Sequence, residues 1–88
     1  MKTDGRGLYL MALTQWGDRA QIIMAMEELA ECSAQLARYL RGRVDIGPAV
    51  EEIADATIML EQMAIIFPGV EEAREHKLAR LRERLRGV

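Results

Sequence analysis

The chain has 88 residues, of which 50% are hydrophobic, 30% charged and only 5% aromatic, and its formal net charge is −2. This length excludes a multidomain enzyme, and the composition is too apolar for a disordered chain and too charged for a membrane span. The small net charge gives no general attraction to nucleic acid or anionic lipid, so neither partner is expected. Because a domain this small buries only about 60–65% of its unfolded surface, we expect a helical protein that completes its apolar burial by oligomerising.

Cysteine content and the N-terminal segment indicate the compartment. Cys32 is the only cysteine, which excludes an intrachain disulfide and a Cys-rich zinc site and fits a reducing environment. We expect Cys32 to be a small buried apolar residue. Residues 8–13 form an apolar stretch after Lys2 and Arg6, but it is too short for a signal peptide and lacks a cleavage site. We therefore expect a cytoplasmic protein.

Three breaks divide the chain into helices. The first break is Gly17-Asp18, where Asp18 is the expected N-cap. The second is a glycine-containing connector at residues 41–48, and its proline suits a first helical turn. The third is Pro68-Gly69. The expected helices cover residues 7–16, 18–41, 48–67 and 70–86. No segment alternates with the period of a strand. The sequence therefore predicts one all-α domain over residues 1–88, a bundle of three to four helices per chain.

Apolar residues on these helices recur at steps of three and four, which places them on one face of each helix. We expect these faces to form the core, with methionines filling gaps. The positions are Ile22, Met26, Leu29, Ser33, Leu36 and Leu40 on the first long helix, Ile53, Ala56 or Thr57, Leu60, Ala64 and Phe67 on the second, and Leu78, Leu81, Leu85 and Val88 on the last.

Two pairs of acidic residues lie off these apolar faces. Glu28 and Glu31 are three positions apart on the first long helix, and Glu52 and Asp55 have the same spacing on the second. Residues three apart are neighbours on a helix surface, so each helix projects two carboxylates together. Residues 27–55 contain seven acids, three arginines and no lysine. This imbalance requires a counter-charge.

The two acidic segments also resemble each other. AMEELAECS at residues 25–33 and AVEEIADAT at residues 49–57 match in chemistry at nearly every position. If the two helices pack antiparallel, the two acid pairs can face each other, and four carboxylates in one pocket raise one another's pKa unless a cation is present. An all-oxygen ligand set favours Mg²⁺ or Mn²⁺, and hydrolysis of a phosphoanhydride is the natural reaction class. The single histidine, His76, is expected at the surface.

The segment EELAE at residues 27–31 is followed by EIAD at residues 52–55. Together they resemble the EExxE and ExxD pair of the MazG-like, all-α nucleoside triphosphate pyrophosphohydrolases. WGDRAQ at residues 16–21 and KLARL at residues 77–81 also look like segments of that family's small members, so the similarity covers roughly residues 14–84. The resemblance implies Mg²⁺-dependent hydrolysis between the α and β phosphates of a nucleoside triphosphate, which yields a monophosphate and pyrophosphate.

The resemblance also implies roles for individual residues. The implied Mg²⁺ ligands are Glu28, Glu31, Glu52 and Asp55. The candidate catalytic residues are Glu27 and Glu28, with Glu27 either behind the ligands or helping to position the attacking water.

Four further residues are candidates for binding the substrate. Lys77, and after it Arg80, would contact the phosphates, although both also suit a solvated helix face. Trp16 could stack on the base and Gln21 could hydrogen-bond to it. Their structural alternatives are a hydrophobic anchor for the first helix and an exposed polar side chain. Nothing in the sequence identifies the base or the sugar.

Members of the MazG-like family form dimers, often paired into tetramers, in which helices from two chains complete the bundle. The resemblance therefore implies a homodimer or homotetramer. The alternative is a non-catalytic oligomerisation or protein-interaction module whose acid pairs only add solubility and whose arginine-rich residues 74–86 contact an acidic partner. The two hypotheses differ in whether the protein depends on a metal ion.

Overall fold

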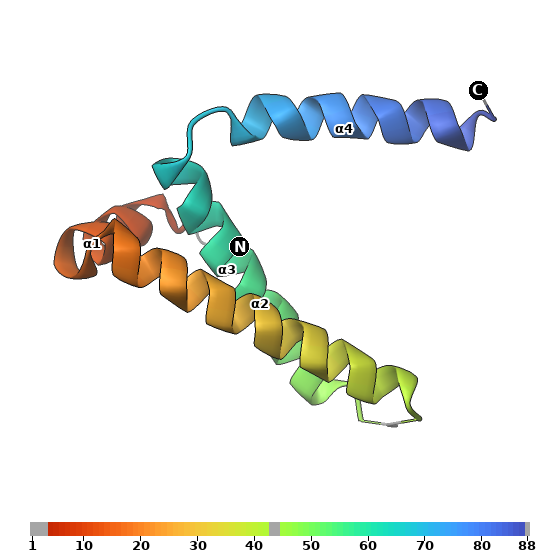
Figure 1. The fold of residues 1–88 in the computed structure, drawn as a ribbon, viewed down its shortest axis with the longest axis horizontal. Helices are drawn as coiled ribbons and strands as arrows, with labels where there is room; N and C mark the ends of the chain where they lie inside the picture. The colour runs from red at the N-terminus through yellow and green to blue at the C-terminus, as the bar shows by residue number, and fades with distance from the viewer. Residues whose placement is uncertain (1–3, 43–44, 88) are drawn as a thin grey trace.

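The structure, a computed structural model, describes residues 4–42 and 45–87. This part of the chain forms no strand and four helices: α1 (Arg6–Trp16), α2 (Asp18–Leu40), α3 (Gly47–Ile66) and α4 (Val70–Leu85) (Figure 1). The all-α prediction is confirmed, and every helix boundary lies within one residue of the range expected from the sequence. Val88 of the expected apolar pattern and residues 43–44 of the connector lie outside the described residues.

Gly17 separates α1 from α2. Its φ of 88° is a backbone conformation that glycine adopts without steric cost. The Gly17 N–H donates to the Leu13 carbonyl at the end of α1, and the Gly17 carbonyl accepts from Gln21 N–H in α2. Gly17 is therefore the N-cap of α2, and the prediction of Asp18 as the cap is wrong. Asp18 is instead the first helical residue, where its negative charge favours the N-terminus of a helix.

Helices α2 and α3 pack against each other antiparallel, and α1 crosses the open end of this pair (Figure 1). The direction follows from a hydrogen bond between Gln21, near the start of α2, and Gln62, near the end of α3. Among the described residues, the buried apolar ones are Ala25 on α2 and Ala56 and Met59 on α3. The core inside one chain is therefore a narrow seam of small and unbranched side chains.

The apolar faces that the sequence predicts as core do not form this seam. Met26 is 66% exposed and Leu40 is 83% exposed. The other predicted core residues that are exposed include Leu29, Leu36, Ile53, Leu60, Phe67, Leu78, Leu81 and Leu85. Among the predicted positions that the structure describes, only Ala56 is buried, so the core prediction is wrong for a single chain. Cys32, also expected to be buried, is half-buried.

The error has a structural reason. Gln21, Ala25 and Glu28 are separated by steps of four and three, so they form a helical stripe as regular as the apolar one. In the structure α2 turns this second stripe toward α3, since small residues let the two backbones approach closely. The face that carries the carboxylates is thus the inner face of the helix pair. The large apolar residues are left on the outside of the chain, an exposure that is typical of an interaction surface.

Helix α4 stands apart from the other helices. It begins after Gly69, whose φ is 96°, and it extends away from the α1–α3 unit as a separate arm (Figure 1). Helices α3 and α4 are bent by 120° relative to each other. No single helix in the described residues is long and apolar enough to cross a membrane. Only the bent pair of α3 and α4, taken together, has the length and composition of a membrane span.

A hydrogen bond from the Tyr9 hydroxyl to the Glu61 carboxylate joins α1 to α3. This bond, partial burial and the negative charges of Glu61 and Asp4 raise the pKa of Tyr9 to about 12. The neutral, donating form of the phenol is therefore favoured in the folded state.

We expect Tyr9→Phe to lower the free energy of unfolding by about 1–2 kcal/mol near neutral pH, because the substitution removes a hydrogen bond to a charged acceptor. The pKa of Tyr9 is higher in the folded chain than the ordinary value of 10.0. The stabilisation is thus fully present below pH 10.0 and is lost as the pH rises through about 12. Urea unfolding of both proteins across this range measures the effect. Tyr39→Phe, at an exposed tyrosine of α2, is the control, and equal loss in both variants would contradict the role of Tyr9.

Candidate metal site

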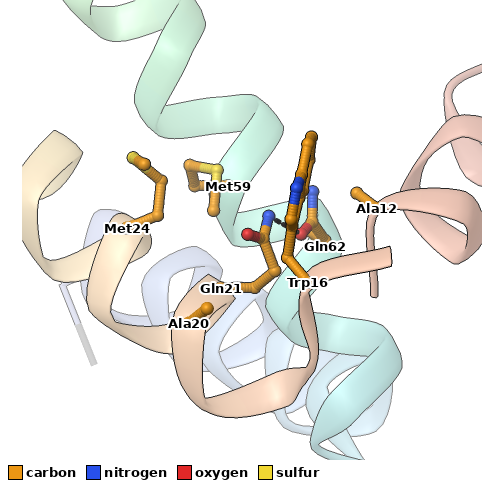
Figure 2. A pocket seen from close by; sticks show the side chains of 7 residues that line it. All are labelled: Ala12, Trp16, Ala20, Gln21, Met24, Met59 and Gln62. Carbon is orange, nitrogen blue, oxygen red and sulfur yellow. Dashed lines mark hydrogen bonds between the residues drawn. The ribbon is translucent and has the colours of Figure 1, made fainter. Parts of the chain in front are cut away.

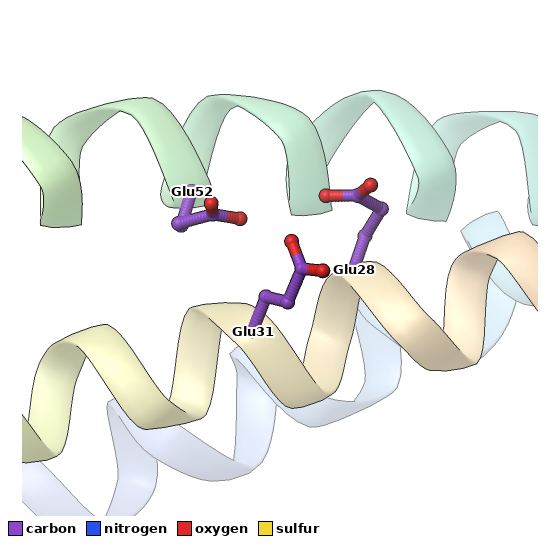
Figure 3. Close-up of side chains that lie close together, drawn as sticks. All are labelled: Glu28, Glu31 and Glu52. Atoms are coloured by element: carbon purple, nitrogen blue, oxygen red, sulfur yellow. The ribbon is translucent and has the colours of Figure 1, made fainter.

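Three carboxylates meet between α2 and α3. Glu28 and Glu31 project from α2, and Glu52 projects from α3 toward them (Figure 3). One oxygen of each carboxylate lies within 4.8 Å of the corresponding oxygens of the other two. The antiparallel packing produces this arrangement, because it places the middle of α2 against the first half of α3. The structure thus brings together three of the four residues that the sequence suggests as metal ligands.

Asp55 and Glu27 lie at the edge of this carboxylate cluster. Both side chains are exposed. The Asp55 charge contributes to raising the pKa of Glu28 and of Glu52, and the Glu27 charge contributes to raising that of Glu28. Asp55 is therefore near the cluster without belonging to the compact group of three. An aspartate side chain is one methylene shorter than glutamate and reaches less far from its helix.

The surroundings of Glu28 and Glu52 raise the pKa of both side chains. Burial between the helices is the main cause that raises the pKa of Glu28, and the Glu31 charge is the next. Burial also raises the pKa of Glu52, followed by the Glu31 and Glu28 charges and a hydrogen bond with the Glu31 side chain. Closely spaced carboxylates repel one another, and a cation bound between them would compensate their charge.

Two oxygens of the cluster are shielded from solvent and have no partner. Glu28 Oε2 and Glu52 Oε2 accept no hydrogen bond in the structure. Between residues that the structure describes, the one ion pair joins Arg74 to Glu75 on α4, so no described Lys or Arg neutralises the cluster. A buried carboxylate oxygen without a partner is unfavourable. Carboxylate oxygens are the ligands that Mg²⁺ and Mn²⁺ prefer, so the residues present fit a hard divalent cation.

The phosphate-binding candidates lie elsewhere in the chain. Lys77 and Arg80 are on α4, which does not pack along α2 (Figure 1). Lys77 lines an apolar hollow of about 540 Å³ at the junction of α3 and α4, with Leu60 and Leu81 among its neighbours. The structure of one chain therefore does not bring these two cations to the carboxylates. His76 is exposed, as expected.

The base-binding candidates line a pocket where α1, α2 and α3 meet. This pocket measures about 570 Å³, and its lining includes Trp16, Gln21 and Gln62 (Figure 2). Gln21 is only 6% exposed, so its expected exposure is wrong. Trp16 is 63% exposed, which argues against the hydrophobic anchor for the first helix that the sequence suggested as an alternative. We call this space the glutamine pocket.

Sequence analysis did not identify Gln62. A signal was present, since Asp55, Met59 and Gln62 follow one helical stripe at steps of four and three. A polar residue that continues an acidic stripe into an apolar segment is a candidate for the inner face of the helix. The residue was missed because the apolar stripe, and not the acidic one, was expected to face inward.

Comparison with models of protein families, with curated proteins and with solved structures finds no match to the chain. The chemistry must therefore be judged from the residues. Three clustered carboxylates with two unpartnered oxygens are suited to holding a divalent cation. A pocket with an aromatic ring and buried amides at one end of the same helix pair is suited to an organic group.

Proposed function

We propose that this protein hydrolyses nucleoside triphosphates to nucleoside monophosphate and pyrophosphate with Mg²⁺ or Mn²⁺, like the MazG-like enzymes that its acidic motifs resemble. The observation that carries the proposal is the Glu28, Glu31 and Glu52 cluster, in which two carboxylate oxygens are shielded and unpartnered. A phosphoanhydride is the substrate that such a cation centre suits best, because Mg²⁺ in proteins is commonly completed by phosphate oxygens.

In this proposal Glu28, Glu31 and Glu52 hold the cation, and Asp55 adds negative charge beside them. A cation bound there would polarise the phosphate and lower the pKa of an attacking water. A cation would give the desolvated carboxylates of Glu28 and Glu52 the compensation that no Lys or Arg among the described residues supplies. Glu27, exposed at the edge of the cluster, is the candidate for orienting the water.

A second copy of the chain would complete the site. Residues 76–86 carry five Lys or Arg and one Glu, whereas α3 carries four acids and no Lys or Arg. These opposite charges favour the second half of α4 of one copy against the acidic face of α3 of another, which would bring Lys77 and Arg80 to the phosphates. The exposed apolar residues of α2 and α4 favour the same association. We therefore propose a homodimer, or two such dimers paired into a homotetramer.

We expect a panel of ribo- and deoxyribonucleoside triphosphates, incubated with the protein and Mg²⁺, to yield monophosphate and pyrophosphate. Chromatography identifies the products, and hydrolysis in ¹⁸O-labelled water shows which product receives the new oxygen. Diphosphate and orthophosphate as products would contradict cleavage between the α and β phosphates. EDTA should abolish turnover, because the proposal requires the cation.

The second candidate is a non-catalytic helical oligomerisation or protein-interaction module. The exposed apolar faces and the separate α4 arm favour it, since both are suited to covering by another chain. It predicts no turnover of any nucleotide and no stabilisation by a divalent cation. The two candidates are therefore distinguished by the product assay together with a metal titration.

A further inference from the structure

The glutamine pocket contains two buried amides at the contact between α2 and α3. Gln21 is 6% exposed and Gln62 is 4% exposed, so both side chains are more than nine-tenths buried. Gln21 Nε2 donates a hydrogen bond to Gln62 Oε1. Burying two amides in a pocket whose other lining residues are apolar is unfavourable unless their remaining groups also find partners.

The hydrogen bond between the amides uses neither the carbonyl of Gln21 nor the NH₂ group of Gln62. An amide has a carbonyl and an NH₂ group, so bonding Nε2 of Gln21 to Oε1 of Gln62 leaves Gln21 Oε1 and Gln62 Nε2 for a ligand. If both amides rotate by half a turn, the bond between them is kept with donor and acceptor exchanged. The remaining groups are then a donor on Gln21 and an acceptor on Gln62. The pair can therefore present an acceptor on Gln21 with a donor on Gln62, or a donor on Gln21 with an acceptor on Gln62.

The apolar walls of the glutamine pocket suit a flat ring. The Trp16 indole lies beside the contact between the two amides, and the side chains of Met24 and Met59 lie beyond Gln21 (Figure 2). Trp16 is 63% exposed, which leaves much of the ring free for stacking. A volume of about 570 Å³ lies within the usual range for small-molecule pockets, about 300–1,000 Å³.

The glutamine pocket lies at a suitable distance from the carboxylate cluster. Gln21 precedes Glu28 by seven positions on α2, and a helix rises 1.5 Å per residue, so the two are about 10 Å apart along the axis. This separation is about the length needed to place a base at one end and the phosphates of the same nucleotide at the other.

We propose that the glutamine pocket binds the base of the nucleotide and that the Gln21–Gln62 pair reads its Watson–Crick edge in either polarity. This inference depends on the proposed function only in that the ligand carries a triphosphate; binding of the base does not depend on it. Adenine and cytosine present an amino donor beside a ring-nitrogen acceptor, whereas guanine and uracil present a keto acceptor beside a ring N–H donor. The pair matches both patterns. The pocket thus selects an intact edge and is tolerant of base identity.

The test uses nucleoside monophosphates in EDTA and follows the fluorescence of Trp16, the only tryptophan. We expect the four ordinary monophosphates to quench it with dissociation constants within about fivefold of one another. N1-methyladenosine and N3-methyluridine monophosphates should bind about tenfold or more weakly, because methylation leaves a buried amide group unpaired. Equal binding of methylated and unmethylated bases, or more than hundredfold differences among the ordinary four, would overturn the inference.

Two substitutions at Gln62 sharpen the test. Gln62→Met keeps an unbranched side chain of similar length. It should raise the dissociation constants of all four ordinary monophosphates by about tenfold. Gln62→Glu offers only acceptors, so the Gln21 amide must donate to it, and two acceptors then face the ligand. Guanine alone among the four bases presents two adjacent donors, and this variant should favour it over adenine by about tenfold. If the ratio of the guanine and adenine dissociation constants is the same in the variant as in wild type, the proposed pairing of Gln21 and Gln62 with the base is contradicted.

The failure of this inference and the failure of the proposed function are distinguishable. Quenching by all four ordinary monophosphates that base methylation weakens, without hydrolysis of any triphosphate, would support the glutamine pocket and reject the triphosphate chemistry. Hydrolysis without quenching, or equal hydrolysis of ribose triphosphate that lacks a base, would support the chemistry and reject the glutamine pocket. Circular dichroism of each variant shows that the helices are retained.

Discussion

Replacing Glu52 with Gln is expected to lower kcat/KM for nucleoside triphosphate hydrolysis by about 10²–10³-fold, the loss typical of removing one group that stabilises transition-state charge. Glu52 is the α3 member of the carboxylate cluster, and its Oε2 is shielded and unpartnered. Glutamine keeps the shape of the side chain and removes the charge that would hold the cation. Initial rates over a range of substrate and Mg²⁺ concentrations separate weaker metal binding from slower chemistry.

The matched control is Glu51→Gln. This residue is adjacent in sequence, carries the same charge and is exposed outside the cluster. We expect its activity to stay within about twofold of wild type, because exposed surface substitutions usually have small effects. If both variants lose activity equally, the effect is one of net charge on α3 and the cluster is not the catalytic centre.

Divalent cations are expected to reverse the stability order of wild type and Glu52→Gln. Burial and the neighbouring charges raise the pKa of Glu52 in the folded chain. Its contribution to stability is therefore greatest below the ordinary value of 4.5 and is lost as the pH rises through the higher folded value. At neutral pH without metal, the Gln variant should consequently melt above wild type.

With Mg²⁺ or Mn²⁺ the wild type should melt above the variant, since the cation binds only the folded cluster. A ligand at a hundredfold excess over its Kd adds about 2.7 kcal/mol, and each kcal/mol raises the Tm of a domain this size by about 4–8 °C. We therefore expect a rise on the order of 10 °C or more for wild type and almost none for Glu52→Gln.

Thermal unfolding at one fixed protein concentration, in EDTA and then in Mg²⁺, measures this reversal. The fixed concentration matters because association with a second copy also changes the Tm. Glu51→Gln serves again as the control and should respond to metal as wild type does. An equal rise in wild type and Glu52→Gln would show that the cation binds elsewhere.

The positions of the helices could be predicted from local signals in the sequence. Gly17 permits the positive φ between α1 and α2, and Pro68-Gly69 ends α3 before α4 begins. These effects act within a few residues of the chain, so they do not depend on which segments later pack together. The spacing of Glu28 and Glu31 also indicates without further information that two carboxylates share one side of a helix.

The orientation of each helix could not be predicted in the same way. Helix α2 carries an apolar stripe through Met26 and an acidic stripe through Glu28, and both have helical spacing. Choosing the apolar stripe as the inner face led to the wrong core and to the expectation that Gln21 is exposed. Hydrophobic burial does favour large apolar residues inside, but it does not specify whether the partner is α3 or another chain.

The sequence alone determined an all-α chain, its four helices and the clustering of acids on two of them. Only the tertiary structure decided that Glu52 meets Glu28 and Glu31, and that Gln62 pairs with Gln21 in the seam. The physical reason is that backbone propensities and helical periodicity act over short stretches of chain, whereas the direction and rotation of two packed helices depend on residues more than twenty positions apart.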